Sequence, residues 1–401
     1  MGRASRRGLA VLCSASALIL LYWAGSGGRA VWEPAQFRVV RHKDLDPVTP
    51  DNNVAMRSTE GGQTPGQQPD QSQGGTARAR VLLVSYMRSG STFTGDIFQA
   101  SPQVFYLYEP LIYVNDDDYM APTERSAKNR LIPIAFGIPH PPEIHNYTLD
   151  TLNCGFTDHN LRFLYALTYS QSTTEFDQCQ KKLGVKPSNF GECGERLRER
   201  CVQSKAVVSK ILRLKMWEVE RLLREDPELR VIHLVRDPRG VYISRRAARY
   251  YFGDAPFCAR FNADAAKSAE LQAKYPGRIL TTRYEDLATN PLGIAKLLFN
   301  FGGIPWTEEV QTTLVSMTSN ADVQTTEHVF STKRKNSSLT ATSWRQKIAF
   351  ENSWKLQKLC SSAMELYGYV PFQTDQELRD LNIASFTRDY SHVFFKAQIE
   401  R

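Results

Sequence analysis

Residues 81–98 read VLLVSYMRSGSTFTGDIF, and this stretch decides the expected fold. Its first four residues form a short apolar run, which is typical of a buried strand. A turn rich in Ser and Gly follows, and a helix is expected over 93–100. A turn that leads from a strand into a helix directs backbone N–H groups and the positive end of the helix dipole at an anion. The stretch therefore predicts a phosphate-binding loop.

The rest of the chain from residue 80 extends this unit into an α/β domain. Continuous β-branched and aliphatic residues predict further buried strands at 104–108, 206–212, 230–235 and 279–283. Helices are expected between the strands, at 217–224, 241–250, 264–274 and 292–301. This alternation predicts a three-layer α/β fold with a central parallel sheet.

The loop differs from the loop that binds nucleoside triphosphates. When Gly90-Ser91-Thr92 is aligned with the final Gly-Lys-Ser/Thr of that loop, Ser91 stands where the lysine belongs. A cation stands earlier instead, at Arg88, and Ser89 adds further N–H and hydroxyl donors. A triphosphate-dependent kinase is therefore disfavoured. Taken alone, the segment could also be a Ser/Gly turn with an arginine facing solvent.

A second predicted strand ends in a complementary pair of residues. The strand at 230–235 is followed by Arg236, and Ser244 lies eight residues further on, in the next predicted helix. This spacing places a guanidinium at the strand end and a hydroxyl two turns into the helix, both facing the crevice where parallel sheets bind ligands. An arginine and a serine could hold a second phosphate, such as a 3′-phosphate.

Together the two segments resemble the donor-binding motifs of sulfotransferases. Residues 88–93, RSGSTF, are similar to the 5′-phosphosulfate motif, and LVRDPRG at 234–240, with Ser244, is similar to the 3′-phosphate motif. The galactose/N-acetylglucosamine/N-acetylgalactosamine 6-O-sulfotransferase family has further motifs like those found here. In the same order, these are FYLYEPL at 105–111, RYEDL at 283–287, NSS at 336–338 with WR at 344–345, and GY at 368–369.

The similarity spans about residues 80–369, with two departures from the family pattern. Thr92 stands where the family usually has a second serine, and Tyr108 stands where it usually has phenylalanine. The resemblance implies a P-loop-like sulfotransferase fold and an enzyme that uses 3′-phosphoadenosine 5′-phosphosulfate (PAPS) as co-substrate, without a metal. The donor-binding residues that it implies are Arg88, Ser89, Gly90, Ser91, Thr92, Phe93, Arg236, Ser244, Lys335 and Trp344.

Catalytic roles are expected for Arg88 and Glu109. Arg88 would neutralise the leaving phosphate, because sulfuryl transfer, like phosphoryl transfer, depends mostly on positioning and charge stabilisation. Glu109 follows the strand at 104–108 and would project at the same sheet edge, where its carboxylate could take a proton from a sugar hydroxyl. Alternatively, Glu109 caps a helix or orients the acceptor. Lys205, Lys210 and Arg213 could line an acceptor groove or be solvated.

Two further segments have alternative interpretations. The basic loop at 331–338 either closes over the donor, as the resemblance implies, or is a solvated surface run. RYEDL at 283–287 is expected to fix a strand end and start a helix rather than to touch substrate.

The N-terminus predicts a membrane anchor. Arg3, Arg6 and Arg7 precede an uncharged run at 8–25, and basic residues before such a run keep that end cytoplasmic. We expect a cytoplasmic tail at 1–7, a signal-anchor at 8–25, a disordered stem at 26–79 and a lumenal catalytic domain at 80–401. The protein would then be a single-pass type II protein of the Golgi membrane. A cleaved signal peptide is the alternative, since the run is short and small residues follow it.

The cysteines favour an oxidising compartment. Six lie beyond the predicted anchor and can pair without remainder, and no Cys-x-x-Cys pattern indicates zinc. Fifteen pairings are possible. Four of the six fall in 153–201, a polar segment that interrupts the α/β alternation and is expected to be an insertion held by disulfides. Asn146 and Asn336 begin N-glycosylation sequons.

The formal net charge of +8 favours anionic partners. A lumenal domain disfavours nucleic acid, and the resemblance implies a glycan acceptor on proteoglycans or glycoproteins, of keratan or chondroitin type, modified at a 6-hydroxyl. The alternative is a catalytically inactive protein of the same fold that binds sulfated glycans. The sequence leaves homo-oligomerisation open.

Overall fold

The computed structural model describes residues 78–111, 141–157, 169–183, 190–250, 253–319 and 331–387, all within the compact unit Gln73–Arg401. The predicted tail and anchor, and the predicted stem up to residue 77, lie outside the described residues. Within the described ranges, no helix is long and apolar enough to span a membrane.

Five parallel strands form the central sheet, in the order β2-β3-β1-β4-β5. The strands are β1 (Ala79–Ser85), β2 (Val104–Tyr108), β3 (Ala206–Ile211), β4 (Leu229–Val235) and β5 (Ile279–Arg283). The five predicted strands are thus confirmed, each to within two residues. The strand that carries the predicted phosphate loop, β1, lies at the centre, between β3 and β4.

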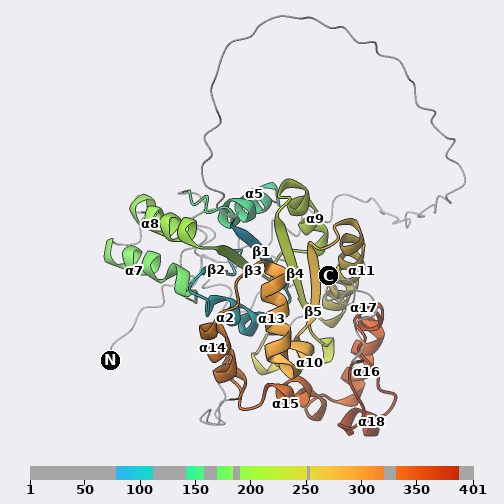
Figure 1. Cartoon of the computed structure of the whole chain (residues 1–401). Coiled ribbons are helices and arrows are strands. Elements are labelled where there is room, and N and C mark those ends of the chain that lie inside the picture. The colour runs from blue at the N-terminus through green and yellow to red at the C-terminus, as the bar shows by residue number, and fades with distance from the viewer. Residues whose placement is uncertain are drawn as a thin grey trace, which may run out of the picture. The chain divides into compact units, whose positions relative to one another are not determined.

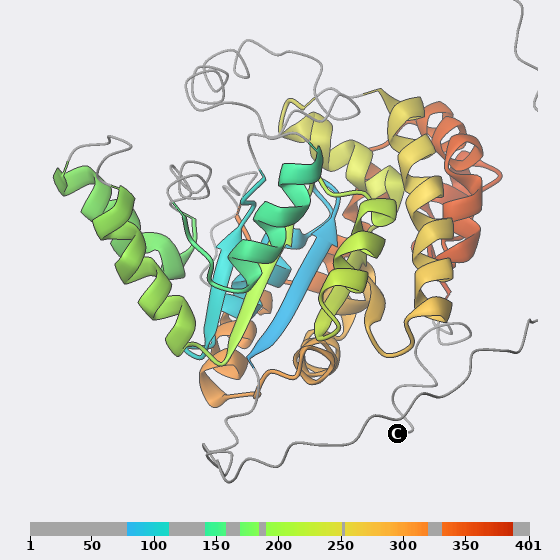
Figure 2. The ribbon, with the colours of Figure 1, turned by 90° about the horizontal axis from the view of Figure 1, so that it is seen from above.

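Helices cover both faces of the sheet (Figures 1 and 2). One face packs against α2 (Ser91–Gln99), α12 (Tyr284–Thr289), α13 (Pro291–Gly302) and α14 (Glu308–Thr318). The other packs against α5 (Pro141–Leu152), α7 (Thr174–Leu183), α8 (Phe190–Gln203) and α9 (Met216–Glu225). The predicted three-layer α/β architecture is confirmed.

The alternation of side chains along β1 explains why its sequence is uniformly apolar. Val81 and Leu83 belong to the core under α2 and α13, whereas Leu82 and Val84 belong to the core under α5 and α9. Each of the four is at most 2% exposed. A strand that is buried on both faces needs an apolar residue at every position.

A third core cluster lies beside the sheet and contains α10 (Pro238–Ala247), α11 (Asp254–Lys274), α16 (Phe350–Leu359) and α17 (Ser361–Leu366). The remaining helices in the described ranges are η1 (Gln171–Thr173), α15 (Ser337–Thr342), η3 (Ser343–Gln346) and α18 (Asp375–Arg379). Two predicted helices begin three or more residues earlier than expected. Pro238 opens α10, and Pro256 is tolerated in the first turn of α11, because first-turn N–H groups have no partner within the helix.

The six predicted disulfide cysteines are paired, as expected. The bonds are Cys154–Cys201, Cys179–Cys193 and Cys258–Cys360. The first two lie within the predicted insertion, which contains α7 and α8. The third joins α11 to the residue that separates α16 from α17, so it fastens the third core cluster.

Candidate active site

The predicted phosphate loop connects β1 to α2 in a tight turn. Arg88 has a φ of 72° and Gly90 a φ of 89°, so two of the loop residues adopt the left-handed conformation. A Cβ atom at position 90 would collide with the ring of Tyr284. Glycine is therefore required there for both its φ and its size. Ser91 opens α2 directly after this turn, so the N-terminus of the helix faces the loop.

The structure brings the two predicted donor motifs into contact. The Nε of Arg88 donates to the Oγ of Ser244 in α10 over 3.1 Å. Nη1 of Arg236, which directly follows β4, donates to the carbonyl oxygen of Arg88 over 3.0 Å. Residues 148 and 156 positions apart in sequence thus meet where β1 and β4 end. This edge is the one at which parallel sheets bind ligands.

Positive charge is concentrated at this contact. Burial lowers the pKa of the Arg88 guanidinium, and the neighbouring Arg236 and Arg334 lower it further. The guanidinium of Arg236 also lies over the ring of Tyr284, 4.4 Å from its centroid. Because each cation raises the free energy of its charged neighbour, an anion bound between them would relieve the repulsion.

Two polar atoms at this site lack hydrogen-bond partners among the described residues. They are Oγ of Ser89 and Nε of Arg236, and both atoms are buried. Buried polar groups are nearly always paired, so each such atom calls for an explanation. One belongs to each motif, which fits a ligand with two separate anionic groups. Over all the residues that the structure describes, no three His, Cys, Asp or Glu side chains lie together in a group that could hold a metal ion.

The buried carboxylate of Glu285 accepts a hydrogen bond from the backbone of the second motif. Oε1 of Glu285 accepts the backbone N–H of Asp237 at 3.1 Å, and Oε2 accepts the hydroxyl of Tyr369 at 3.0 Å. Burial, followed by the charge of Asp237, raises the pKa of Glu285 to about 7, although Arg236 acts in the opposite direction. Glu285 lies at the start of α12, so RYEDL ends a strand and starts a helix, as expected.

Glu109 follows β2 with a φ of 45° and is held between two cations. Its Oε1 accepts from Nζ of Lys210 at 2.9 Å, and its Oε2 accepts from Nη1 of Arg213 at 3.1 Å. Burial alone would raise the pKa of Glu109, but Lys210 and Arg213 bring it below its usual range. The carboxylate is thus ionised at neutral pH, as a proton acceptor must be, while its lowered pKa and its two engaged oxygens favour the orienting role.

These contacts show that Lys210 is not a solvated surface residue, which was one of its two interpretations from the sequence. Its side chain is 0% exposed. Nζ also lies 3.4 Å from Oγ1 of Thr92, in the first turn of α2. Lys210 therefore links Glu109 to the phosphate loop. A single strand sequence gave no sign of this link, because the three residues come from β3, the end of β2 and α2.

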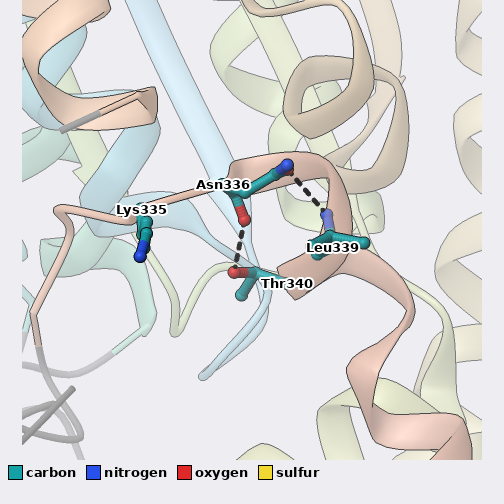
Figure 3. A pocket seen from close by; sticks show the side chains of 4 residues that line it. All are labelled: Lys335, Asn336, Leu339 and Thr340. Carbon is teal, nitrogen blue, oxygen red and sulfur yellow. Dashed lines mark hydrogen bonds between the residues drawn. The ribbon is translucent and has the colours of Figure 1, made fainter. Parts of the chain in front are cut away.

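The other predicted donor residues have different surroundings. Lys335 lines a pocket with Asn336, Leu339 and Thr340, and the Asn336 side chain caps α15 (Figure 3). Phe93, on α2, lies in the core on that side of the sheet. Trp344 is buried against the guanidinium of Arg239, and a Cβ at Gly240 would lie within 3.4 Å of both the Trp344 indole and Nε of Arg236, so Trp344 is next to the second motif. In the basic loop, Arg334 acts on Arg88, and the sequence did not distinguish it from Lys335.

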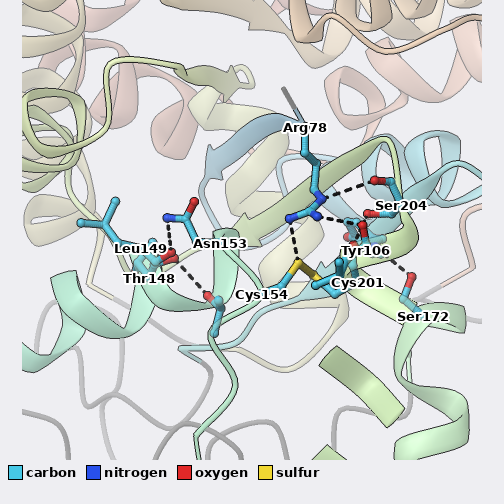
Figure 4. The surroundings of a disulfide bond; sticks show 11 residues. Arg78, Tyr106, Thr148, Leu149, Asn153, Cys154, Ser172, Cys201 and Ser204 are labelled. Atoms are coloured by element: carbon cyan, nitrogen blue, oxygen red, sulfur yellow. Dashed lines mark hydrogen bonds between the residues drawn. A yellow bond between two sulfur atoms is a disulfide. The ribbon is translucent and has the colours of Figure 1, made fainter. Parts of the chain in front are cut away.

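The disulfide-bonded insertion covers the edge strand next to Glu109. Oγ of Ser172 accepts the backbone N–H of Tyr106 in β2 at 2.8 Å, and Ser170 donates its hydroxyl to the Tyr106 carbonyl. Arg78, next to β1, donates to Sγ of Cys154 (Figure 4). The insertion thus pairs with an otherwise open sheet edge and ties it to the start of β1.

Comparison with known proteins identifies relatives of this chain. A family model described as a sulfotransferase domain matches residues 78–368. Carbohydrate sulfotransferase 3 of Mus musculus is 31% identical over 351 residues, covering 79% of this chain and 72% of the relative. Carbohydrate sulfotransferase 6 of Homo sapiens is 27% identical, covering 78% and 86%. The sulfotransferase domain from the Synechococcus PCC 7002 olefin synthase has a TM-score of 0.41 and 16% identity, covering 74% of this chain and 98% of that one.

Proposed function

Because the chain belongs to the carbohydrate sulfotransferase family, we propose that it transfers a sulfuryl group from PAPS to a glycan. The proposed target is the 6-hydroxyl of a galactose, N-acetylglucosamine or N-acetylgalactosamine residue in a keratan- or chondroitin-type chain. The observation that carries the proposal is the direct contact between the two anion-binding segments, through Arg88, Ser244 and Arg236.

The two segments fit the two anionic ends of PAPS. The loop with Ser89, Gly90, Ser91 and Thr92 presents backbone N–H groups and hydroxyls at the N-terminus of α2 and would hold the 5′-phosphosulfate. Arg236 and Ser244 would hold the 3′-phosphate. The unpaired atoms of Ser89 and Arg236 support this assignment, one in each segment.

The proposed reaction is a direct displacement at sulfur. The acceptor hydroxyl oxygen forms a bond to sulfur while the bond from sulfur to the 5′-phosphate oxygen breaks, and the electron pair of that bond stays on the phosphate. Arg88 stabilises the charge that develops there. The hydroxyl proton passes to the carboxylate of Glu109, whose ionised state is favoured by Lys210 and Arg213. In the alternative role, Glu109 orients the acceptor through the same carboxylate.

We also propose that the catalytic domain, residues 80–401, works in the Golgi lumen behind an N-terminal signal-anchor and stem. Three disulfides in the described part of the chain are compatible with an oxidising compartment. Topology mapping by protease protection of sealed Golgi vesicles would test this, and digestion of the catalytic domain in intact vesicles would contradict it.

The decisive experiment incubates the purified full-length protein with radiolabelled PAPS and desulfated keratan and chondroitin, and then maps the labelled carbon. We expect label at carbon 6 of one sugar type. Label at another carbon would contradict the 6-O assignment. Glycan binding without any transfer would support the inactive binding protein instead.

Arg88→Ala is the matched variant. We expect it to lose about 100-fold or more in kcat while remaining folded, as is typical when a charge-stabilising donor is removed. Full activity of a folded Arg88→Ala protein would refute the mechanism.

A further inference from the structure

Lys210 occupies an unusual position for a lysine. Its side chain is 0% exposed, and its ammonium lies 3.6 Å from the centroid of the Tyr108 ring. It is 2.9 Å from Oε1 of Glu109 and 3.4 Å from Oγ1 of Thr92. These contacts come from the edge strand β2 and from the first turn of α2, so one ammonium bridges two elements of the site.

Such a buried ion pair is not a simple source of stability. Removing an ammonium and a carboxylate from water costs several kcal/mol each, and an apolar pair of the same volume is often at least as stable. Arg213 already satisfies the other oxygen of Glu109. The position of Lys210 is therefore better explained by its second contact, with Thr92.

Two side chains from separate elements meet at this ammonium. The ring of Tyr108, the last residue of β2, lies 3.6 Å from Nζ, and the hydroxyl of Thr92 in α2 lies 3.4 Å from it. Thr92, Tyr108 and Lys210 thus form one packed group at the junction between the phosphate loop and the candidate base.

We propose that Lys210 is a positioning residue that couples the phosphate loop to Glu109, with Thr92 and Tyr108 holding its ammonium in place. The inference rests on the proposed function. The phosphate loop has no lysine of its own, and β3 supplies one from the neighbouring strand. The orientation of the Glu109 carboxylate then depends on Thr92, which does not belong to its own strand or loop.

A double-mutant cycle tests this coupling in the purified full-length protein. Lys210→Met should lower kcat about 100-fold, because an unfixed general base loses most of its contribution. Thr92→Val keeps the backbone N–H and removes only the hydroxyl, and we expect about a tenfold loss, which is the low end for a hydrogen bond to a charged group. In the Lys210→Met background, Thr92→Val should cost severalfold less, because only the direct contribution of the hydroxyl to donor binding is then lost.

Arg213→Met is the matched control, because Arg213 bonds Glu109 but has no recorded contact with Thr92. The losses from Thr92→Val and Arg213→Met should therefore multiply. If the fold losses in kcat multiply in both cycles, the proposal is wrong.

A pH profile separates positioning from a merely structural role. The charged or titratable groups that act on this pair are Lys210 and Arg213 on Glu109, Tyr108 beside both, and Asp96 of α2 on Lys210. Without Lys210, the acid limb of kcat should move about one pH unit upward, since an opposite charge at this range lowers a carboxyl pKa by one to three units. Lys210→Arg keeps the charge, so its acid limb should stay in place. An unmoved limb in Lys210→Met would contradict the inference.

The same cycles can be run on the affinity for adenosine 3′,5′-bisphosphate, measured by calorimetry. This readout requires no turnover, so it remains informative if the wild-type protein fails to transfer sulfuryl groups, which would refute only the proposed function. We expect Thr92→Val to weaken binding severalfold in the wild type and clearly less in Lys210→Met. If Lys210→Met does not fold, Lys210→Arg replaces it in the cycle, because a guanidinium cannot reproduce the compact contact between ammonium and hydroxyl. Identical losses in every background would refute the coupling.

Discussion

The two halves of the candidate active site are built in different ways. At the ends of β1 and β4, two short segments form the donor half, and bonds to the backbone hold them, as when Arg236 donates to the Arg88 carbonyl. At the ends of β2 and β3, the Glu109 half consists of isolated charged side chains that hold one another, Glu109 between Lys210 and Arg213.

This difference determines which kind of change each half tolerates. The donor half depends on backbone shape and on the core beneath it, so it should be sensitive to glycine replacement and to loss of cross-links. The Glu109 half depends on charge balance, so it should respond to pH and to single charge removals. The following three predictions rank these effects from the largest to the smallest.

Loss of the Cys258–Cys360 disulfide should have the largest effect on stability. It closes a loop of 102 residues, whereas Cys179–Cys193 closes one of 14. In the chain-entropy model these loops correspond to about 4.7 and about 3 kcal/mol. Denaturant unfolding of the two double Cys→Ser variants should show the larger loss of unfolding free energy when Cys258 and Cys360, in the third core cluster, are replaced. The reverse order would mean that the donor half does not depend on that cluster.

Titration of Glu285 should destabilise the donor half as the pH rises. The unfolded carboxyl titrates near 4.5 and the folded one at about 7, so in that interval the native state holds a proton that the unfolded state has released. Stability therefore falls between pH 4.5 and 7, by roughly 3 kcal/mol at about 1.4 kcal/mol for each pKa unit. Glu285→Gln should flatten this slope in unfolding free energies measured from pH 5 to 8.

Glu109 provides the opposite control. Its folded pKa is lowered, so its contribution to stability is present above pH 4.5 and is lost as the pH falls further. Glu109→Gln should change the slope only on that acid side. If the two substitutions changed the pH dependence of the unfolding free energy in the same direction, the proposed contrast between the halves would be wrong.

Replacement of Gly90 should cost no more stability than the titration of Glu285, although its effect on binding is large. Alanine there has an unfavourable φ and collides with the Tyr284 ring, which together cost about 3 kcal/mol. We expect affinity for adenosine 3′,5′-bisphosphate to fall about 100-fold by calorimetry. Glu109→Gln should leave that affinity within twofold. Unchanged binding by Gly90→Ala would show that the loop shape is not what holds the donor.

The sequence predicted the donor half better than the Glu109 half. The motif residues Arg88 and Ser89 are neighbours in the chain, and Arg236 and Ser244 share one strand-helix unit, so spacing alone indicated how they face the sheet edge. The five buried strands were equally visible, because burial on both faces leaves continuous apolar runs.

The rest depended on packing between distant elements. Lys210 lies 101 residues from Glu109, and the sequence does not show that the two pair. Its place within the buried strand predicted at 206–212 was the one signal that favoured burial over solvation. Lys335 stays a predicted donor contact, and its neighbour Arg334 lowers the pKa of Arg88. That effect depends on how the loop folds back toward β1, which the sequence does not show. The disulfide pairing was likewise one of fifteen until the fold brought the cysteines together.

The backbone at the two proposed catalytic residues has a consequence for protein engineering. Among the described residues, four other than glycine have positive φ, and Arg88 and Glu109 are two of them. Glycine at position 88 would relax the chain by about 1 kcal/mol or more and would remove a cation that its neighbours repel. A search for thermostable variants would therefore select the replacement that deletes the proposed catalytic guanidinium. Glycine at position 109 would instead leave the buried ammonium of Lys210 without its carboxylate, which costs more than the backbone gains. Durability and turnover thus compete at Arg88, so a robust version of this enzyme has to gain its stability elsewhere.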